Sequence, residues 1–484
     1  MFNFVLNIPR VKKYRLFAAL YLFCVYSKGV FTRSAWLDDW GSLIDPDQTV
    51  LHIIRDGRPV LALFFKLLFG TFGSLDSIFA IRLFGLIGLL LLCDLVLKTL
   101  LKLNPTPVIV LITIISFTIA PFQFSAHMAN AFCFSWASYL SIQGYLNFRK
   151  SKLGPKVLGL TLMVLSLAIY PLMSFFVMVF VYFSWLISES SIRILLKQLL
   201  DAIGLLFVAF VCLFIILMIY MSVANFTFND RVQFVSINNL AEKIGWFVSR
   251  PLLLSYRPYL VSSPSVREAI IQAIIIIASL LLIFRLYFGA FGRTLQQFLL
   301  FNLIMAASMA PLLLSAQNQI EIYFTLSAAW LFVVTFLYLS ITVLAARVRL
   351  PKSVLAIMMN IFGALLLVFG FYTINDRYIN FIQPIHSSTR SFILSELEDC
   401  TASQRAKDVI IIPRESSWPV LKNLGVLSQP SDLQSVWVPV SVVKLIAKDL
   451  YPKEIMKIDV RWGTKNDSGC KVDLNDYLKK ALAK

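Results

Sequence analysis

Charged residues are scarce in this sequence: Asp, Glu, Lys and Arg make up 14% of the 484 residues, whereas hydrophobic residues make up 58%. A soluble globular protein has about 25% charged residues, so the composition excludes an ordinary soluble domain. Uncharged apolar runs such as Val211 to Tyr220 are typical of membrane spans. The composition therefore predicts an all-α polytopic membrane protein, and it excludes the disordered and fibrous classes.

Several motifs that carry chemistry are also missing. The sequence has no P-loop, no dinucleotide-binding glycine fingerprint, no HExxH motif and no paired CxxC, so ATP hydrolysis, redox and zinc-protease functions lack support. Cysteine is rare as well, and four of the six lie in apolar runs. Only Cys400 and Cys470 lie elsewhere, and we expect them to form a disulfide in an oxidising compartment.

The few charges are unevenly distributed. Residues 374–484 contain 16 Lys and Arg and 13 Asp and Glu, which is close to soluble composition, whereas residues 1–373 hold most of the net charge of +18. We therefore expect a transmembrane domain over 1–373 and a small C-terminal α/β domain over 374–484. Its expected helices are Ser391–Leu397 and Val443–Leu450, and its expected strands are Val409–Ile412, Val436–Val440 and Ile455–Arg461. The basic excess is typical of membrane topology and headgroup contact, so we expect membrane lipids and no nucleic acid as partners.

Apolar segments of helix length predict about 11 spans. They lie near 15–31, 77–97, 105–121, 125–147, 157–170, 171–189, 200–223, 269–284, 298–316, 322–345 and 353–373. Tyr170-Pro171 interrupts one apolar stretch that is too long for a single crossing, and we interpret it as a tight hairpin. With that hairpin, 17 basic residues fall in the short connections of one side and none in those of the other. The positive-inside rule then predicts a cytoplasmic N-terminus, with outer loops over 32–76 and 224–266 and an outer C-terminal domain.

The first outer loop holds two candidate sites. Asp38 and Asp39 follow the first predicted span, with Trp36 and Trp40 on either side. Such a pair can supply a general base or hold a divalent cation, and tryptophan faces suit sugar rings; an ordinary solvated turn with an aromatic belt is the alternative.

The second candidate is Arg55-Asp56-Gly57-Arg58-Pro59. Its two arginines could hold a phosphate by two-point contacts, with headgroup contact and an Arg–Asp pair as the alternative. Val60 to Phe69 is apolar but too short to span, which predicts a helix lying in the membrane surface. Weaker candidates are His127, a packing residue by the simpler interpretation, and Arg231 in the second outer loop, for acceptor or phosphate contacts.

The chain resembles the GT-C superfamily of polytopic glycosyltransferases, and within it the bacterial Gtr-type O-antigen glucosyltransferases of serotype conversion. The resemblance rests on Asp38-Asp39 followed by Arg55-Asp56-Gly57-Arg58-Pro59, on the basic N-terminus, and more loosely on Ala168-Ile169-Tyr170-Pro171. It covers roughly residues 1–375 and is clearest in the first 75.

The resemblance implies transfer of a sugar, expected to be glucose, from undecaprenyl phosphate to a lipid-linked O-antigen glycan at the periplasmic face of the bacterial inner membrane. It implies a base at Asp38 or Asp39 and an inverting single displacement that requires no cofactor, with a divalent cation on the pair left as an alternative. Arg55 and Arg58 suit the donor phosphate, with weaker substrate contacts from Trp36, Trp40, Asp56 and Arg231. The alternatives are a polymerase or ligase of the same glycans and a flippase for lipid-linked sugars.

Overall fold

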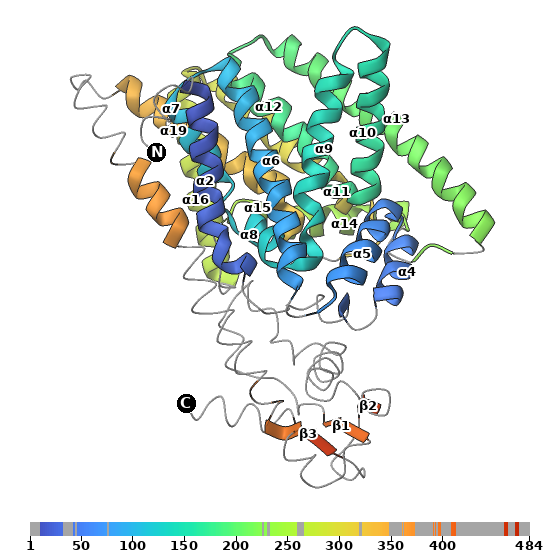
Figure 1. The fold of residues 1–484 in the computed structure, drawn as a ribbon. Coiled ribbons are helices and arrows are strands. Elements are labelled where there is room, and N and C mark those ends of the chain that lie inside the picture. Colours follow the sequence, from blue (N-terminus) through green and yellow to red (C-terminus); the bar gives the residue numbers. More distant parts are fainter. Residues whose placement is uncertain are drawn as a thin grey trace.

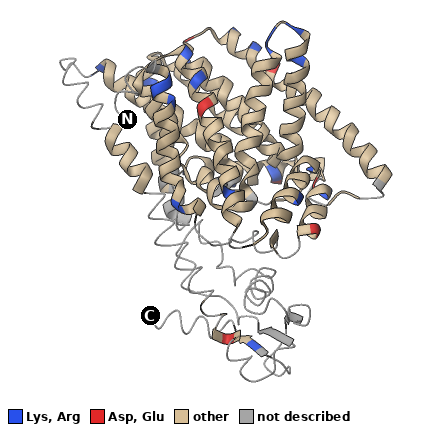
Figure 2. Ribbon diagram, viewed as in Figure 1, with Lys and Arg blue, Asp and Glu red and all other residues tan. Residues whose placement is uncertain are grey.

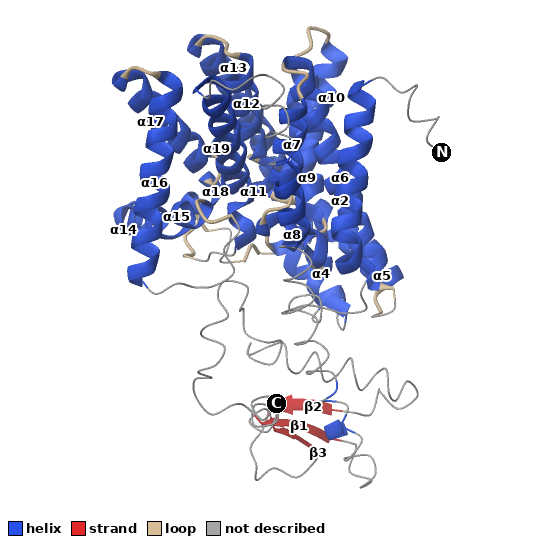
Figure 3. Cartoon of the chain, turned by 90° about the vertical axis from the view of Figure 1, so that its left-hand side faces the viewer, coloured by secondary structure: helices blue, strands red, loops and turns tan. Residues whose placement is uncertain are grey.

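The computed structural model is mainly helical, as Figures 1 and 3 show. It describes residues 10–31, 42–43, 46–74, 77–224, 227–229, 233–258, 266–318, 322–347, 361, 363–372, 391, 393, 395–397, 408–412, 459–462 and 470–473. Asp38, Asp39, Trp36, Trp40, Arg231 and Cys400 lie outside the described residues, so the predictions that rest on them stay predictions.

Ten helices of the described residues form a bundle. They are α2 (Arg10–Phe31), α6 (Ile78–Leu103), α7 (Pro107–Ser116), α9 (Cys133–Phe148), α10 (Leu153–Ile169), α12 (Phe176–Ser188), α13 (Ile192–Ala224), α16 (Val266–Phe288), α17 (Phe291–Ala307) and α19 (Leu326–Arg347). Apolar side chains fill the space between them, and Trp330 is the largest that is fully buried.

Four described helical segments are long and apolar enough to cross a membrane: 78–103, 171–188, 192–223 and 326–347. The all-helical membrane class predicted from the composition is thus confirmed, whereas the count of 11 spans stays a prediction. Three predicted spans are interrupted. The segment 105–121 contains the end of α7 at Ser116, the segment 125–147 contains a break before α9, and the segment 298–316 contains the end of α17 at Ala307.

Local side chains stabilise the first of these interruptions. The Thr118 hydroxyl donates to the Ile115 carbonyl at 2.8 Å, and the Gln123 amide donates to the Thr118 carbonyl at 2.8 Å. Carbonyl groups at a helix end inside a membrane need such partners, because no water reaches them. A hydropathy average over the segment cannot detect this break.

We call one end of the bundle the basic end. It contains the start of α2, the end of α6 and the α9–α10 and α12–α13 connections. Arg15 on α2 and Asp94 on α6 form a two-point ion pair there, with Nη2 to Oδ2 at 2.6 Å. Tyr145 near the end of α9 donates to the Gln198 carbonyl on α13. The basic residues of these connections therefore lie together (Figure 2), as the positive-inside argument requires.

Short helices gather at the opposite end, here the loop end (Figures 1 and 3). They are α4 (Pro46–Arg55), α5 (Pro59–Phe72), α8 (Ala120–His127), η1 (Ala129–Ala131), α11 (Pro171–Ser174), η3 (Ile237–Asn239), α14 (Leu240–Phe247), η4 (Val248–Leu252), α15 (Leu253–Ser255), α18 (Ala310–Leu314) and η5 (Ile322–Thr325). The predicted helix over Val60 to Phe69 is confirmed as part of α5. It buries Phe65 and Phe69, and it exposes Leu63 and Leu67.

The chain reverses at Tyr170-Pro171, as the hairpin interpretation expects. Helix α10 runs to the loop end, Tyr170 has an extended backbone with φ −155° and ψ 100°, and Pro171 begins α11. Proline suits this first helical position, because its fixed φ fits the helix and its missing N–H leaves no donor unpaired. Helix α12 then returns to the basic end.

Three short strands form a parallel sheet in the order β2-β1-β3, with β1 at Asp408–Ile412, β2 at Asp459–Trp462 and β3 at Cys470–Asp473. The prediction was right for β1 and for the described part of the strand predicted over 455–461, residues 459–461, while it missed β3. The predicted strand over 436–440 lies outside the described residues. Parallel pairing requires crossover connections and is typical of α/β domains, but the α/β domain as a whole stays a prediction.

Two glycines set how closely α9 and α10 approach. A Cβ on Gly159 would lie 2.6 Å from the Gly144 carbonyl oxygen and 2.6 Å from the Phe148 nitrogen. These neighbours are backbone atoms, so they cannot move aside as a flexible side chain could. Small residues at helix crossings are the usual way in which membrane helices come into close contact.

We expect Gly159→Ala to destabilise the protein by about 1–3 kcal/mol, because the two helices must move apart. Gly154→Ala is the matched control, since a Cβ there meets no atom within 4 Å and lies on the same helix. It should leave stability unchanged or raise it slightly. Thermal unfolding of both variants in detergent measures the effect, and equal melting temperatures would contradict the close packing.

Candidate functional site

The Arg55-to-Pro59 motif forms the connection between α4 and α5. Helix α4 ends in a Schellman turn: the Gly57 N–H donates to the Ile54 carbonyl at 2.9 Å, and the Arg58 N–H donates to the Ile53 carbonyl at 3.2 Å. Gly57 has a φ of +76°, which favours glycine at this position. Pro59 then occupies the first turn of α5. The end of α4 and the start of α5 thus account for Gly57 and Pro59. The roles of the three charged residues of the motif do not follow from these helix ends.

Asp56 is the buried centre of this connection. Only 3% of its side chain is exposed. The Asn229 amide donates to Asp56 Oδ1 at 2.8 Å, and Arg58 Nη2 lies 3.9 Å from Oδ2. His52 Nε2, one helical turn earlier, lies 3.6 Å from the same Oδ2. A buried carboxylate requires such donors, because its negative charge has lost contact with water.

Arg58 is held between this carboxylate and the hairpin. Its guanidinium carbon lies 4.5 Å from the centroid of the Tyr170 ring, a cation–π arrangement. About 24% of the Arg58 side chain remains exposed, so the guanidinium is held in place and can still meet a ligand. For Arg55 the structure gives a backbone contact, in which its carbonyl accepts from the Asn229 N–H at 3.1 Å. A clamp made of both arginines therefore stays a prediction.

Three segments far apart in the sequence meet at this point. Asp56 and Arg58 come from the first predicted outer loop, Tyr170 from the hairpin, and Asn229 from the second predicted outer loop. The sequence singled out Asp56 and Arg58. It indicated Tyr170 only as a turn and gave no role to His52, although a histidine one turn before Asp56 on a short helix is a visible signal.

The second loop also contacts the turn that follows α18. The Val235 N–H donates to the Leu314 carbonyl at 2.9 Å, and the Ala316 N–H donates to the Gln233 carbonyl at 2.8 Å. The second loop thus contacts the α4–α5 connection through Asn229 and this turn through Gln233 and Val235. The described parts of the loop lie across the loop end rather than extending away from it.

Lys243 fixes the same turn from α14. Its ammonium donates to the Gln317 carbonyl at 2.6 Å and to Asn318 Oδ1 at 3.0 Å, and it lies 4.1 Å from the centroid of the Trp246 ring. Burial lowers the pKa of this ammonium, because the charged form loses hydration. Sequence reasoning missed Lys243, since a lysine in a loop normally faces water.

His127 and Arg82 are two further buried residues at the loop end. The His127 ring packs against Gly29, where an added Cβ would lie 2.1 Å from Cδ2, and its centroid lies 5.8 Å from that of Tyr26. These contacts support the packing interpretation of His127. Arg82 on α6 is only 1% exposed. A buried ionisable residue in a membrane helix is a functional candidate.

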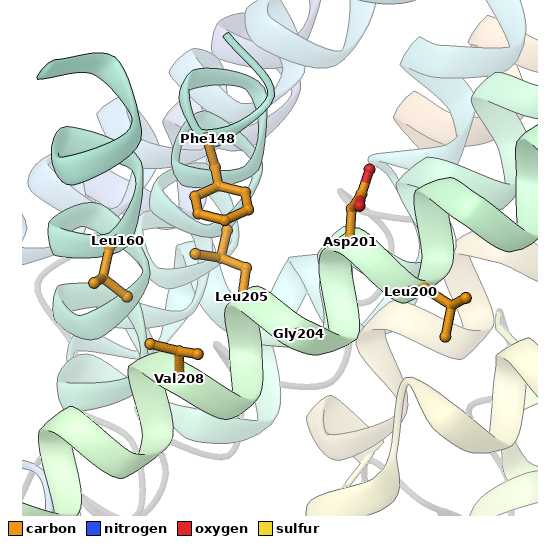
Figure 4. Close-up of a pocket in the computed structure, with 7 residues that line it drawn as sticks. All are labelled: Phe148, Leu160, Leu200, Asp201, Gly204, Leu205 and Val208. Atoms are coloured by element: carbon orange, nitrogen blue, oxygen red, sulfur yellow. The ribbon is translucent and has the colours of Figure 1, made fainter. Parts of the chain in front are cut away.

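A cavity of about 310 Å³ lies elsewhere, between α9, α10 and α13 (Figure 4). Asp201 is the only charged residue among those that line it, which are Phe148, Leu160, Leu200, Asp201, Gly204, Leu205 and Val208. None of the predicted site residues lines this cavity. Among the described residues, no group of three or more His, Cys, Asp or Glu side chains could hold a metal ion.

Comparisons with models of protein families, with curated proteins and with solved structures find no match to this chain.

Proposed function

We propose that this membrane protein transfers a sugar from a polyprenyl-phosphate donor to a lipid-linked glycan, with the reaction at the loop end of the bundle. The observation that carries the proposal is the convergence of Asp56, Arg58, Tyr170 and Asn229 from three loop-end segments. The loop end would then face the periplasm, and the basic end the cytoplasm. The distribution of basic residues supports this orientation in a bacterial inner membrane.

The chemistry requires positive charge on the donor side. When the anomeric carbon–oxygen bond breaks, both bonding electrons stay with the phosphate, and a guanidinium stabilises the charge that develops. Arg58 suits this role because Asp56 and Tyr170 fix its orientation while part of the side chain stays exposed. A group oriented in advance loses little freedom during the reaction.

The acceptor side requires a base. The acceptor hydroxyl oxygen attacks the anomeric carbon from the face opposite the phosphate, so the configuration inverts, and its proton passes to a carboxylate. We assign that carboxylate to Asp38 or Asp39 on the resemblance to GT-C enzymes. Asp56 suits the role less well, because it is buried and already engaged with Asn229 and Arg58.

We expect Arg58→Lys to weaken use of the donor by roughly 10-fold or more, because an ammonium cannot reproduce a planar two-point contact. Arg58→Ala should be weaker still. The measurement is the rate of sugar transfer against the concentration of polyprenyl-phosphate sugar, with purified protein in lipid. The loss should appear mainly in the dependence on donor concentration.

Lys66→Ala is the matched control, because Lys66 is an exposed basic residue on α5, the helix that begins directly after Arg58. It should leave the donor dependence unchanged. Normal donor dependence in both Arg58 variants would assign this residue to headgroup contact. Glycan analysis of cells with and without the protein tests the reaction class, since a gained hexose indicates a transferase and an altered chain length a polymerase.

A further inference from the structure

Helix α14 and the short helices on either side of it carry an apolar row that no part of the described chain covers. Ile237, Leu240, Ile244 and Val248 recur at intervals of three or four residues and are 40% to 88% exposed. Side chains at such intervals lie on one face of a helix. Large apolar side chains grouped this way in water are costly, and they usually mark a binding surface.

Some of the other residues of α14 and of the short helices beside it are buried against the bundle, and others are exposed and polar. Lys243 and Phe247 are buried against the bundle, with Lys243 bonded to Gln317 and Asn318. Asn238, Glu242 and Ser249 are exposed polar residues. At about 100° per residue, Glu242 and Ser249 lie on the side of the helix away from the apolar row. The helix thus has one face for the protein, one apolar face and one polar face.

A membrane surface fits this division better than another protein does. The chain contains four described helical segments able to cross a membrane, and α14 lies at the edge of the loop end (Figure 3). The last part of α13, which leads into this loop, exposes Ile216, Ile219 and Val223 at the same end. Lipid has to cover the exposed apolar side chains of a spanning helix, and the apolar row of α14 lies at the same end of the bundle as these residues of α13.

The polar side of the helix fits this placement as well. At about 100° per residue, Arg250 lies about 120° from the apolar row, toward the side that Glu242 occupies, and both residues are exposed. With the apolar row among the acyl chains, Glu242 and Arg250 would face the headgroups and water.

We infer that α14 lies in the membrane surface at the loop end, with the row Ile237, Leu240, Ile244 and Val248 among the acyl chains and the exposed polar residues Glu242 and Arg250 facing away from them. The apolar face of such a helix enters the boundary by about 5–10 Å. Because Lys243 on the same helix holds the turn after α18, lipid contact would also fix the second loop across the loop end. This inference does not depend on the proposed glycosyl transfer.

The test places a diazirine amino acid at position 244 in one variant and at position 242 in another. Each full-length protein is reconstituted into vesicles of phosphatidylethanolamine and phosphatidylglycerol and then illuminated. The reactive group inserts into whatever touches it, so mass spectrometry separates lipid adducts from water adducts. Both positions are exposed, so access alone cannot explain a difference.

We expect at least roughly fivefold more lipid adduct at 244 than at 242, because only the former faces the acyl chains. Water adducts alone at both positions would overturn the inference. Cross-linking of position 244 to a second copy of the chain would also overturn it, since the row would then be a protein contact. In a third variant, Ile244→Asp with the diazirine at 237, the lipid adduct should fall by a similar factor.

Discussion

Asparagine in place of whichever of Asp38 and Asp39 is the base should nearly abolish sugar transfer while leaving the amount of protein in the membrane unchanged. Asparagine keeps the size of the side chain and one acceptor oxygen, but it cannot take up a proton near neutral pH. Loss of a positioned base typically costs about 10²–10⁴-fold in rate. The measurement is the transfer rate of each variant with lipid-linked donor and acceptor, compared with unmodified protein at equal amounts.

The two carboxylates can be distinguished in the same assay. If one of them is the base, one asparagine variant should lose far more activity than the other. If the pair instead holds a divalent cation, a chelator should abolish activity and added divalent ion should restore it. Near-normal rates in both variants without any effect of chelator would leave the pair as a solvated turn and contradict its assignment as the base.

The comparison is made at equal amounts of protein, because a substitution that disturbs folding would also lower the measured rate. Gly29→Ala provides a contrasting case, since its Cβ would overlap the buried His127 ring and disturb the packing of α2 against α8. That variant should lower both stability and activity. A catalytic residue lowers activity alone, so the pair of measurements separates the two causes.

The sequence predicted those features of the fold that depend on nearby residues. Long apolar runs identified α6, α13 and α19, because a helix of such composition is stable only in a bilayer or a large core. Pro171 identified the reversal after α10, and the short apolar run after Pro59 identified α5. Each of these features is encoded within about 20 residues, the length over which hydropathy and helix-end signals act.

The tertiary contacts of the site could not be predicted in the same way. Asn229 and Asp56 are 173 residues apart, and nothing in either local sequence indicates that they meet. Lys243 is buried only because the Gln317 carbonyl and Asn318 accept its hydrogen bonds, and these lie 74 and 75 residues further along the chain. Sequence patterns indicated which loops carry polar groups, and packing at the loop end decided which of those groups come together.

Substitution of Asp56 should also have a large effect on sugar transfer, because Asp56 connects the two loops. Asp56→Ala should lower the transfer rate by about 10²-fold, since the loss of a group that orients a reacting partner can displace it by an ångström. Arg58 would keep its place over Tyr170 but lose the carboxylate 3.9 Å away. Asp56→Asn keeps an acceptor for Asn229 and loses the charge, so its transfer rate should lie between those of Asp56→Ala and the unmodified protein.

The loop contact itself is tested from the other side. Asn229→Ala removes the donor that lies 2.8 Å from Asp56 Oδ1 but leaves the carboxylate and Arg58 in place. If Asp56 acts by holding the second loop in place, Asn229→Ala should reproduce much of the loss in transfer rate seen in Asp56→Ala. If Asp56 acts by orienting Arg58, the dependence of the rate on donor concentration should change only in the Asp56 variants. Asn239→Ala is the control, because that exposed asparagine lies in the same loop and makes no side-chain cap to α14. Equal rates in Asp56→Ala and unmodified protein would show that the convergence at Asp56 serves packing rather than transfer.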